Sequence, residues 1–92
     1  MIAEARTEIA LEDGSRVKLL NLPVEASQVS ANLVRESSGG EVIWTAAPGD
    51  FGPDEFVAVR FEEGVLIANT WSGYAVWLDL SSGREIRRVF TK

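Results

Sequence analysis

Apolar and polar residues alternate along most of the chain, in short runs that are separated by glycine-containing turns. In residues 7–12, Ile9 and Leu11 alternate with glutamate and alanine, the period of two expected of a strand with one solvated face. The Asp13-Gly14 pair that follows is typical of a hairpin turn with a positive φ. The pattern therefore predicts a strand, a tight turn and a returning strand.

The same alternation predicts eight strands and no long helix. Pro23 ends the second strand because it has no N–H to donate to a ladder. Residues 46–55 contain two glycines and two prolines and are expected to form a loop. Residues 24–28 form a connection that could include one helical turn, and residues 1–6 fit either a strand or an amphipathic helix. The expected strands are 7–12, 16–22, 29–35, 41–45, 56–61, 65–71, 74–80 and 85–90.

Four glycines and one aspartate are expected to shape the turns. Gly83 supplies the left-handed residue of a bulged hairpin, and Gly39 is expected to do the same in the first half. Gly14 and Gly64 end two further turns of the same kind. Asp79 can accept hydrogen bonds from backbone N–H groups a few residues later, as in an Asx turn.

The two halves of the chain are related in sequence. A shift of 44 residues places the Ser-Ser-Gly of residues 37–39 on that of residues 81–83, and Glu41 on Glu85. The repeats span about 7–46 and 56–91, each with four strands and three tight turns. A period of 40–50 residues with four strands is typical of β-propeller blades.

Residues 73–86 resemble a blade of the PQQ-enzyme-like β-propeller repeat, and residues 40–44 resemble its Gly-Lys-Val-Leu-Trp ending. The match is incomplete: Trp77 replaces an alanine, and Arg35 stands where the aspartate of the repeat is expected. The resemblance implies the fold of a blade. It does not extend to the quinone or calcium ion of those enzymes, because two blades cannot enclose such a site.

These observations predict an all-β single domain, residues 1–92, built as two tandem four-stranded antiparallel meanders that are propeller-blade-like. One eight-stranded barrel or sandwich is the alternative. Strands such as 74–80 are apolar on both faces, so two sheets packed on each other would leave apolar area uncovered. The expected partner is therefore the chain itself, as a homo-oligomer, or a larger protein.

Composition excludes several classes of function. The chain has no cysteine and no histidine, so it offers no thiol or imidazole for catalysis, and no cofactor or metal is expected. A formal charge of −5 argues against nucleic acid. Apolar runs are too short to cross a membrane, and the N-terminus lacks signal-peptide features, so a cytoplasmic location is expected. No catalytic constellation is found, and we expect no enzyme activity.

Aromatic residues are the candidate binding groups. Trp44 and Trp77 lie in mid-strand and are expected in the core. Trp71 and Tyr74 flank the turn at residues 72–73 and, with Asn69, could hold a sugar ring or a peptide. The sequence thus favours a small non-catalytic β module for protein interaction or self-assembly, with a lectin-like or small-ligand module as the alternative.

Charged residues form two groups. The acidic residues around the central loop match no calcium-loop spacing and are expected to be a solvated surface. The basic residues near the C-terminus could set the register between subunits or simply be solvated. The acidic group is Asp50, Asp54, Glu55, Glu62 and Glu63, and the basic group is Arg84, Arg87, Arg88 and Lys92.

Overall fold

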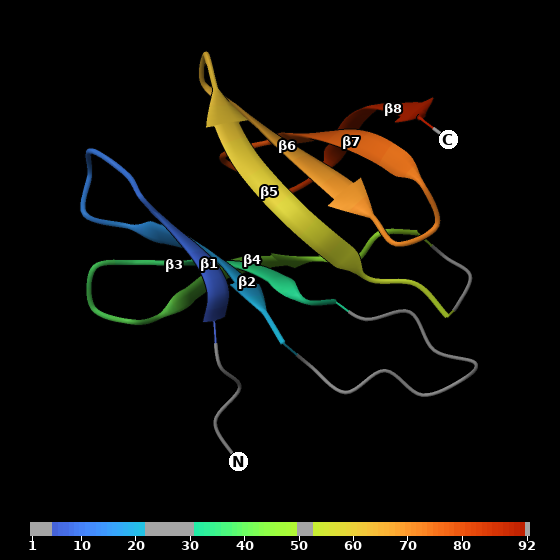
Figure 1. Ribbon diagram of the computed structural model, residues 1–92. Helices are drawn as coiled ribbons and strands as arrows, with labels where there is room; N and C mark the ends of the chain where they lie inside the picture. Colours follow the sequence, from blue (N-terminus) through green and yellow to red (C-terminus); the bar gives the residue numbers. More distant parts are fainter. Residues whose placement is uncertain (1–4, 22–30, 50–52, 92) are drawn as a thin grey trace.

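The computed structural model describes residues 5–21, 31–49 and 53–91. These residues form two antiparallel four-stranded sheets and no helix, with the strands of each sheet in sequence order (Figure 1). The first sheet contains β1 (Ala5–Ala10), β2 (Arg16–Leu20), β3 (Leu33–Glu36) and β4 (Val42–Ala46). The second contains β5 (Phe56–Glu62), β6 (Val65–Thr70), β7 (Tyr74–Asp79) and β8 (Glu85–Phe90).

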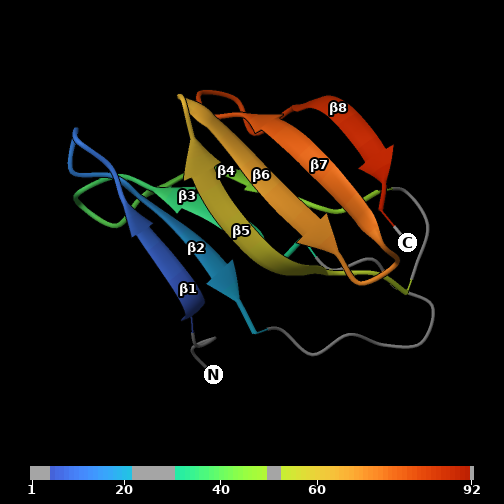
Figure 2. The same ribbon diagram turned by 45° about the horizontal axis from the view of Figure 1, so that its top comes forward.

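The two sheets form two layers that pack against each other (Figure 2). Apolar side chains from both layers make one core, because alternate residues of each strand point toward the opposite sheet. The prediction of two tandem meanders is confirmed. No ladder joins the two sheets within the described residues, so they do not close into a barrel. The buried core contains Val17, Leu19, Leu33, Trp44 and Ala46 from the first sheet, and Phe56, Leu66, Ala68, Val76 and Leu78 from the second.

The strand boundaries differ from the predicted ones at a few ends. β1 begins at Ala5, so the open question about residues 1–6 is settled for residues 5 and 6. β3 begins at Leu33, and residues 31 and 32, which were expected in this strand, are not part of it. The expected connection at 24–28 and the start of the third predicted strand lie outside the described residues. No helix long and apolar enough to cross a membrane occurs among the described residues.

A buried asparagine joins the two layers just before β3. The side-chain amide of Asn32 donates to the carbonyl of Phe56 at 2.8 Å and to that of Leu20 at 3.3 Å, and its oxygen accepts the N–H of Phe56 at 3.0 Å. Asn32 has no exposed surface. It satisfies backbone groups at the start of β5 that have lost contact with water.

The glycines of the turns adopt the left-handed conformation that they favour. Gly14, Gly64 and Gly83 have φ angles of 89°, 82° and 74°. In the β3–β4 turn, however, the positive φ of 89° belongs to Gly40 and not to Gly39. The reason is that Gly40 donates to the Ser37 carbonyl at 2.9 Å and closes the turn one residue later than expected.

Each edge strand carries one β-bulge. In β4, for example, Arg35 pairs with Trp44 and Glu36 pairs with Val42, which leaves Ile43 unpaired. Bulges twist an edge strand and disrupt its row of free N–H and C=O groups, so another strand adds less readily. They also explain why Ile43 and Ile86 are 46% and 61% exposed. The bulge residues of β1, β4, β5 and β8 are Arg6, Ile43, Val57 and Ile86.

Candidate functional site

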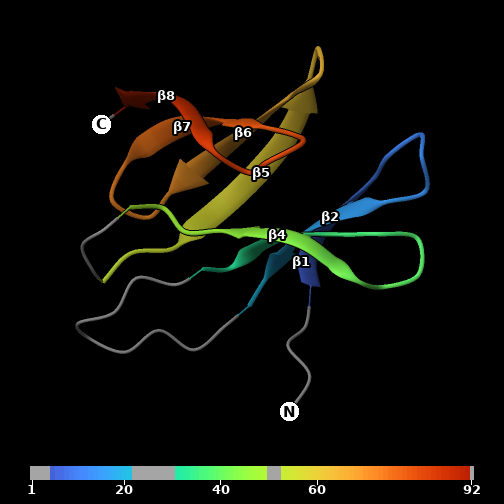
Figure 3. The ribbon, with the colours of Figure 1, turned by 180° about the vertical axis from the view of Figure 1, so that it is seen from behind.

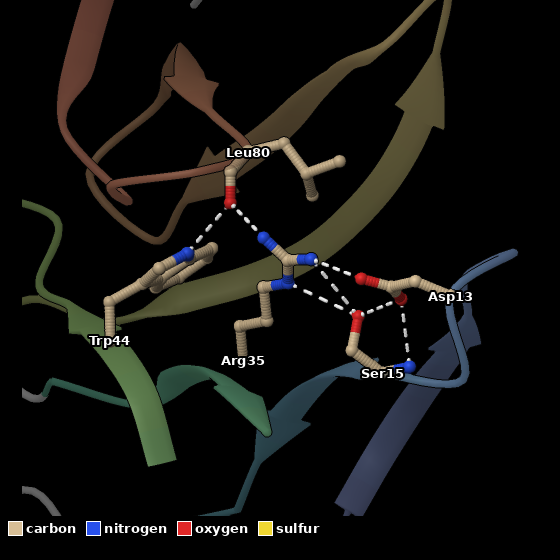
Figure 4. Close-up of polar contacts among 5 residues, drawn as sticks. All are labelled: Asp13, Ser15, Arg35, Trp44 and Leu80. Atoms are coloured by element: carbon tan, nitrogen blue, oxygen red, sulfur yellow. Dashed lines mark hydrogen bonds and ion pairs between the residues drawn. The ribbon is translucent and has the colours of Figure 1, made fainter. Parts of the chain in front are cut away.

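An arginine lies between the two sheets, on the inner face of β3. Figure 4 shows the Arg35 guanidinium between Leu80 of the second layer and the β1–β2 turn. It donates to the Leu80 carbonyl at 2.9 Å, to the Ser15 hydroxyl at 3.1 and 3.2 Å, and to the Asp13 carboxylate at 3.0 Å. The indole N–H of Trp44 donates to the same Leu80 carbonyl at 2.8 Å.

These contacts occupy all three nitrogens of Arg35, whose side chain is only 12% exposed. The hydrogen bonds of the Ser15 hydroxyl and N–H, with a smaller effect of Arg35, lower the pKa of Asp13. Four of the five N–H groups of the guanidinium thus have protein acceptors. We interpret the Arg35 cluster as a structural link between the layers.

The structure separates the three predicted ligand residues. Trp71 is 63% exposed in the β6–β7 turn. Asn69 pairs with Ala75 and faces away from the core, whereas Tyr74 faces the side of the sheet that packs on the first layer. The Tyr74 ring lies 5.1 Å from that of Phe90, with centroids as reference points. Asn69 and Tyr74 are therefore on opposite faces of the sheet and cannot share one ligand.

Asp54 does not belong to a solvated acidic surface as predicted. It is buried, and its carboxylate accepts the Ser72 hydroxyl at 2.7 Å, the Ser72 N–H at 3.1 Å and the Glu55 N–H at 2.9 Å. These bonds fix the segment before β5 to the β6–β7 turn. The carboxylate is already satisfied by three donors, so its role is structural. Asp50, from the same predicted group, lies outside the described residues.

The outer face of the second sheet is apolar at its centre. Ile67 pairs with Trp77, and both point away from the core. Ile67 is 4% exposed because its neighbours cover it, and the Arg87 guanidinium lies 4.9 Å from the centroid of the Trp77 ring. The expectation that Trp77 lies in the core is therefore wrong. This outer face consists of Ala58, Arg60, Glu62, Val65, Ile67, Asn69, Ala75, Trp77, Asp79, Arg87 and Val89.

A shallow hollow opens on this face at the β5–β6 turn. Its floor is apolar, with Val65, Ile67 and Trp77, and its rim carries the carboxylates of Glu62 and Glu63. An apolar floor with an acidic rim suits a side chain that has an aliphatic stem and a cationic head. The sequence missed this hollow because its residues come from three strands and a turn.

The outer face of the first sheet has a different character. Ion pairs cover it: Arg16 lies 3.2 Å from Glu8, and Lys18 lies 2.8 Å from Glu36. Val34 is buried beneath them, with 4% of its surface exposed. The face also carries Thr45, which pairs with Val34, and three apolar residues, Ala10, Leu20 and Val42, of which Val42 is 59% exposed. The outer face of the second sheet has one such ion pair, between Arg60 and Glu62 at 3.4 Å, at its β5 edge.

The bulges provide a common reference point for comparing the two repeats. Following β3 toward its end, the last pair before the bulge of β4 is Arg35 with Trp44. Following β7 toward its end, the last pair before the bulge of β8 is Trp77 with Arg87. The first pair faces the core, whereas the second faces away from it. The repeats are thus packed head to tail: the face that the first sheet buries is the one that the second leaves uncovered.

This comparison also corrects the sequence alignment of the repeats. Ser37, and not Arg35, is the counterpart of Asp79. The N–H of Ser37 donates to the Glu41 carbonyl at 2.7 Å, just as that of Asp79 donates to the Arg84 carbonyl at 2.9 Å at the start of a longer turn. The shift of 44 residues is therefore two residues too long before this turn and one residue too long after it, so Arg35 does not stand at the position of Asp79.

Residues 4–90 of the chain match a family described as Domain of unknown function (DUF7957). No curated protein and no solved structure matches the chain. The resemblance to the PQQ-enzyme-like propeller repeat therefore stays a prediction, and the function has to be argued from the geometry.

Proposed function

The chain belongs to the DUF7957 family, and we propose that it is a small non-catalytic module for protein interaction that docks through the outer face of its second sheet. The observation that carries this proposal is the head-to-tail packing. Trp77 and Arg87 occupy the positions that Arg35 and Trp44 occupy in the first sheet, where the same face is buried against another layer. The fold thus provides a precedent for covering this face with protein.

The composition of the face supports the same reading. Apolar residues lie at its centre, around Ile67 and Trp77, and charged residues lie toward its margins, at Arg60, Glu62 and Arg87. An apolar centre with a polar rim is the usual anatomy of protein interfaces, and tryptophan and arginine are enriched there.

Binding by edge-strand addition is the competing mode of protein recognition. All four edge strands contain a bulge, and Arg6, Ile43, Val57 and Ile86 are the residues that it leaves unpaired. A bulged edge is a poor template for a further strand. The outer face of the second sheet is therefore the better docking surface.

The test is a comparison of three immobilised chains in an extract of the cells that produce the protein. The wild type is compared with Trp77→Thr, and with the control Thr45→Lys on the other outer face. Support requires a protein that wild type and control retain and Trp77→Thr loses, and that binds the wild type directly once purified. Equal retention by all three folded chains, checked by circular dichroism, overturns the proposal.

A further inference from the structure

We propose that a cleft between the two sheets binds a small uncharged molecule that has an apolar body and a carboxamide group. The cleft lies at the end of the sandwich where the β1–β2 turn and the β5–β6 turn diverge (Figure 1). It is separate from the outer face of the second sheet, so this site does not depend on the docking surface proposed above. Its lining includes Leu11, Glu12, Asp13, Arg35, Phe61 and Leu80.

The apolar walls of the cleft are core positions that remain partly uncovered. Phe61 pairs with Leu66, which in turn pairs with the core residue Leu78, so Phe61 points toward the first sheet. It is nevertheless 40% exposed, whereas Leu66 has no exposed surface. Leu11, after β1, and Leu80, after β7, pack against the core and are also only partly buried. Three apolar side chains thus line a space between the layers that the described residues leave open.

Arg35 supplies a hydrogen-bond donor to this space. Its Nε and the two N–H groups of its Nη2 donate to Ser15 and Asp13, whereas its Nη1 donates once, to the Leu80 carbonyl. A guanidinium has five N–H groups, so one N–H of Nη1 has no acceptor among the described residues. Because the Arg35 side chain is largely buried, an acceptor brought by a ligand would satisfy this group.

Asp13 places a hydrogen-bond acceptor beside that donor. One oxygen of its carboxylate accepts from Nη2 of Arg35 at 3.0 Å, and the other accepts the N–H and the hydroxyl of Ser15. A carboxylate oxygen has two lone pairs, so the oxygen bonded to Arg35 can accept once more. Figure 4 shows Asp13 and the Leu80 side chain on the same side of the guanidinium. A donor beside an acceptor is the complement of a primary carboxamide, which accepts through its oxygen and donates through its NH₂ group.

The charges and the size of the cleft define the rest of the ligand. Arg35 and Asp13 already neutralise each other, and Glu12 adds a further carboxylate. An anionic ligand would meet both acids, and an ammonium group has no acceptor for the N–H of Arg35. The cleft has a volume of about 380 Å³, which is within the range of small-molecule sites. Its expected occupant is therefore a small neutral amide.

Three probes of one shape and different charge test the site: phenylacetamide, phenylacetate and phenethylamine. Each is titrated into the isotope-labelled chain, and binding is followed by NMR chemical shifts. Phenylacetamide should bind at about millimolar concentrations and shift the backbone signals of Leu11, Asp13 and Phe61. The two ionic probes should bind about fivefold more weakly, or less. No binding of phenylacetamide, equal or stronger binding of an ionic probe, or shifts confined to the outer face around Trp77 would overturn the inference.

Two phenylalanine variants separate the cleft from the rest of the surface. Phe61→Ala removes one wall of the cleft and should weaken the binding of phenylacetamide by about fivefold or more. Phe90→Ala is the matched control, because Phe90 is 57% exposed at the opposite end of the second sheet. It should leave the affinity unchanged. Equal affinities of the wild type and Phe61→Ala, with both variants folded by circular dichroism, would also overturn the inference. Neither phenylalanine belongs to the outer face, so these results leave the test of the proposed function independent.

Discussion

Gly83, in the β7–β8 turn, lies directly against the indole ring of Trp44 in the first sheet. A Cβ atom built on residue 83 would lie 2.5 Å from Cδ2 of Trp44, far closer than real side chains approach. Figure 3 shows the turn above β4 from behind. The absence of a side chain at this glycine thus lets the second layer close over a core tryptophan of the first.

Replacing Gly83 with alanine should destabilise the protein by about 2–4 kcal/mol, from the strain of a positive φ and from overpacking against Trp44. The control is Gly64→Ala, where φ is also positive but no atom lies within 4 Å of the new Cβ. That variant should lose only about 1–2 kcal/mol. Urea denaturation measures both losses, and equal losses would show that the contact with Trp44 is unimportant.

Replacing Asn32 with alanine should lower the free energy of unfolding by about 2–4 kcal/mol. It leaves the N–H and carbonyl of Phe56 buried without their partner, and each unsatisfied group costs about 1–3 kcal/mol. Asn69→Ala, on the outer face, is the matched control and should change the free energy of unfolding by less than about 0.5 kcal/mol. A similar loss in both variants would contradict the role of Asn32.

Arg35→Met should cost about 1.5–3 kcal/mol, because it removes the charged donor to the Leu80 carbonyl while keeping most of the aliphatic stem. The ion pair with Asp13 should contribute little, since that carboxylate side chain is 59% exposed. A double-mutant cycle with Asp13→Asn measures its share. We expect a coupling below about 1 kcal/mol; a coupling equal to the whole effect of Arg35→Met would show that the ion pair dominates.

Two turn aspartates should make the protein sensitive to acid. Hydrogen bonds from the Ser82 hydroxyl, and then from its N–H, lower the pKa of Asp79 below its ordinary 3.8, as Ser15 does for Asp13. A carboxylate whose pKa is lower when folded stabilises the fold above its unfolded pKa, and this contribution is lost as the pH falls through the folded pKa.

Asp79→Asn keeps an acceptor for the Asx turn and removes the titrating group, so its stability should fall less steeply than that of the wild type below about pH 4. Denaturation midpoints over a series from neutral to acidic pH give the two slopes. Parallel curves for the wild type and for Asp79→Asn would contradict this prediction. Asp13→Asn is expected to act in the same direction.

Much of the fold could be predicted because its signals are local. Alternation identified the strands, and Gly14, Gly64 and Gly83 marked turns whose φ angles are positive. Which residue of a turn has the positive φ was harder to predict. Gly40 and not Gly39 has the positive φ, because the choice depends on which N–H closes the hydrogen bond. The candidate site could not be predicted from local signals, because Glu62, Ile67 and Trp77 come together only through the register of the strands.

The sequence by itself determined the number of strands, their grouping into two four-stranded repeats and the solvated face of the first strand, because periodicity and turn chemistry act within a few residues. Tertiary structure decided which face each sheet buries. The repeat alignment is two residues out in β3 and β7 and one residue out in β4 and β8, and a slip of one residue in a strand exchanges its two faces. Only the bulges and the packed core show that Trp77 faces outward where Arg35 faces inward, and that difference defines the proposed docking surface.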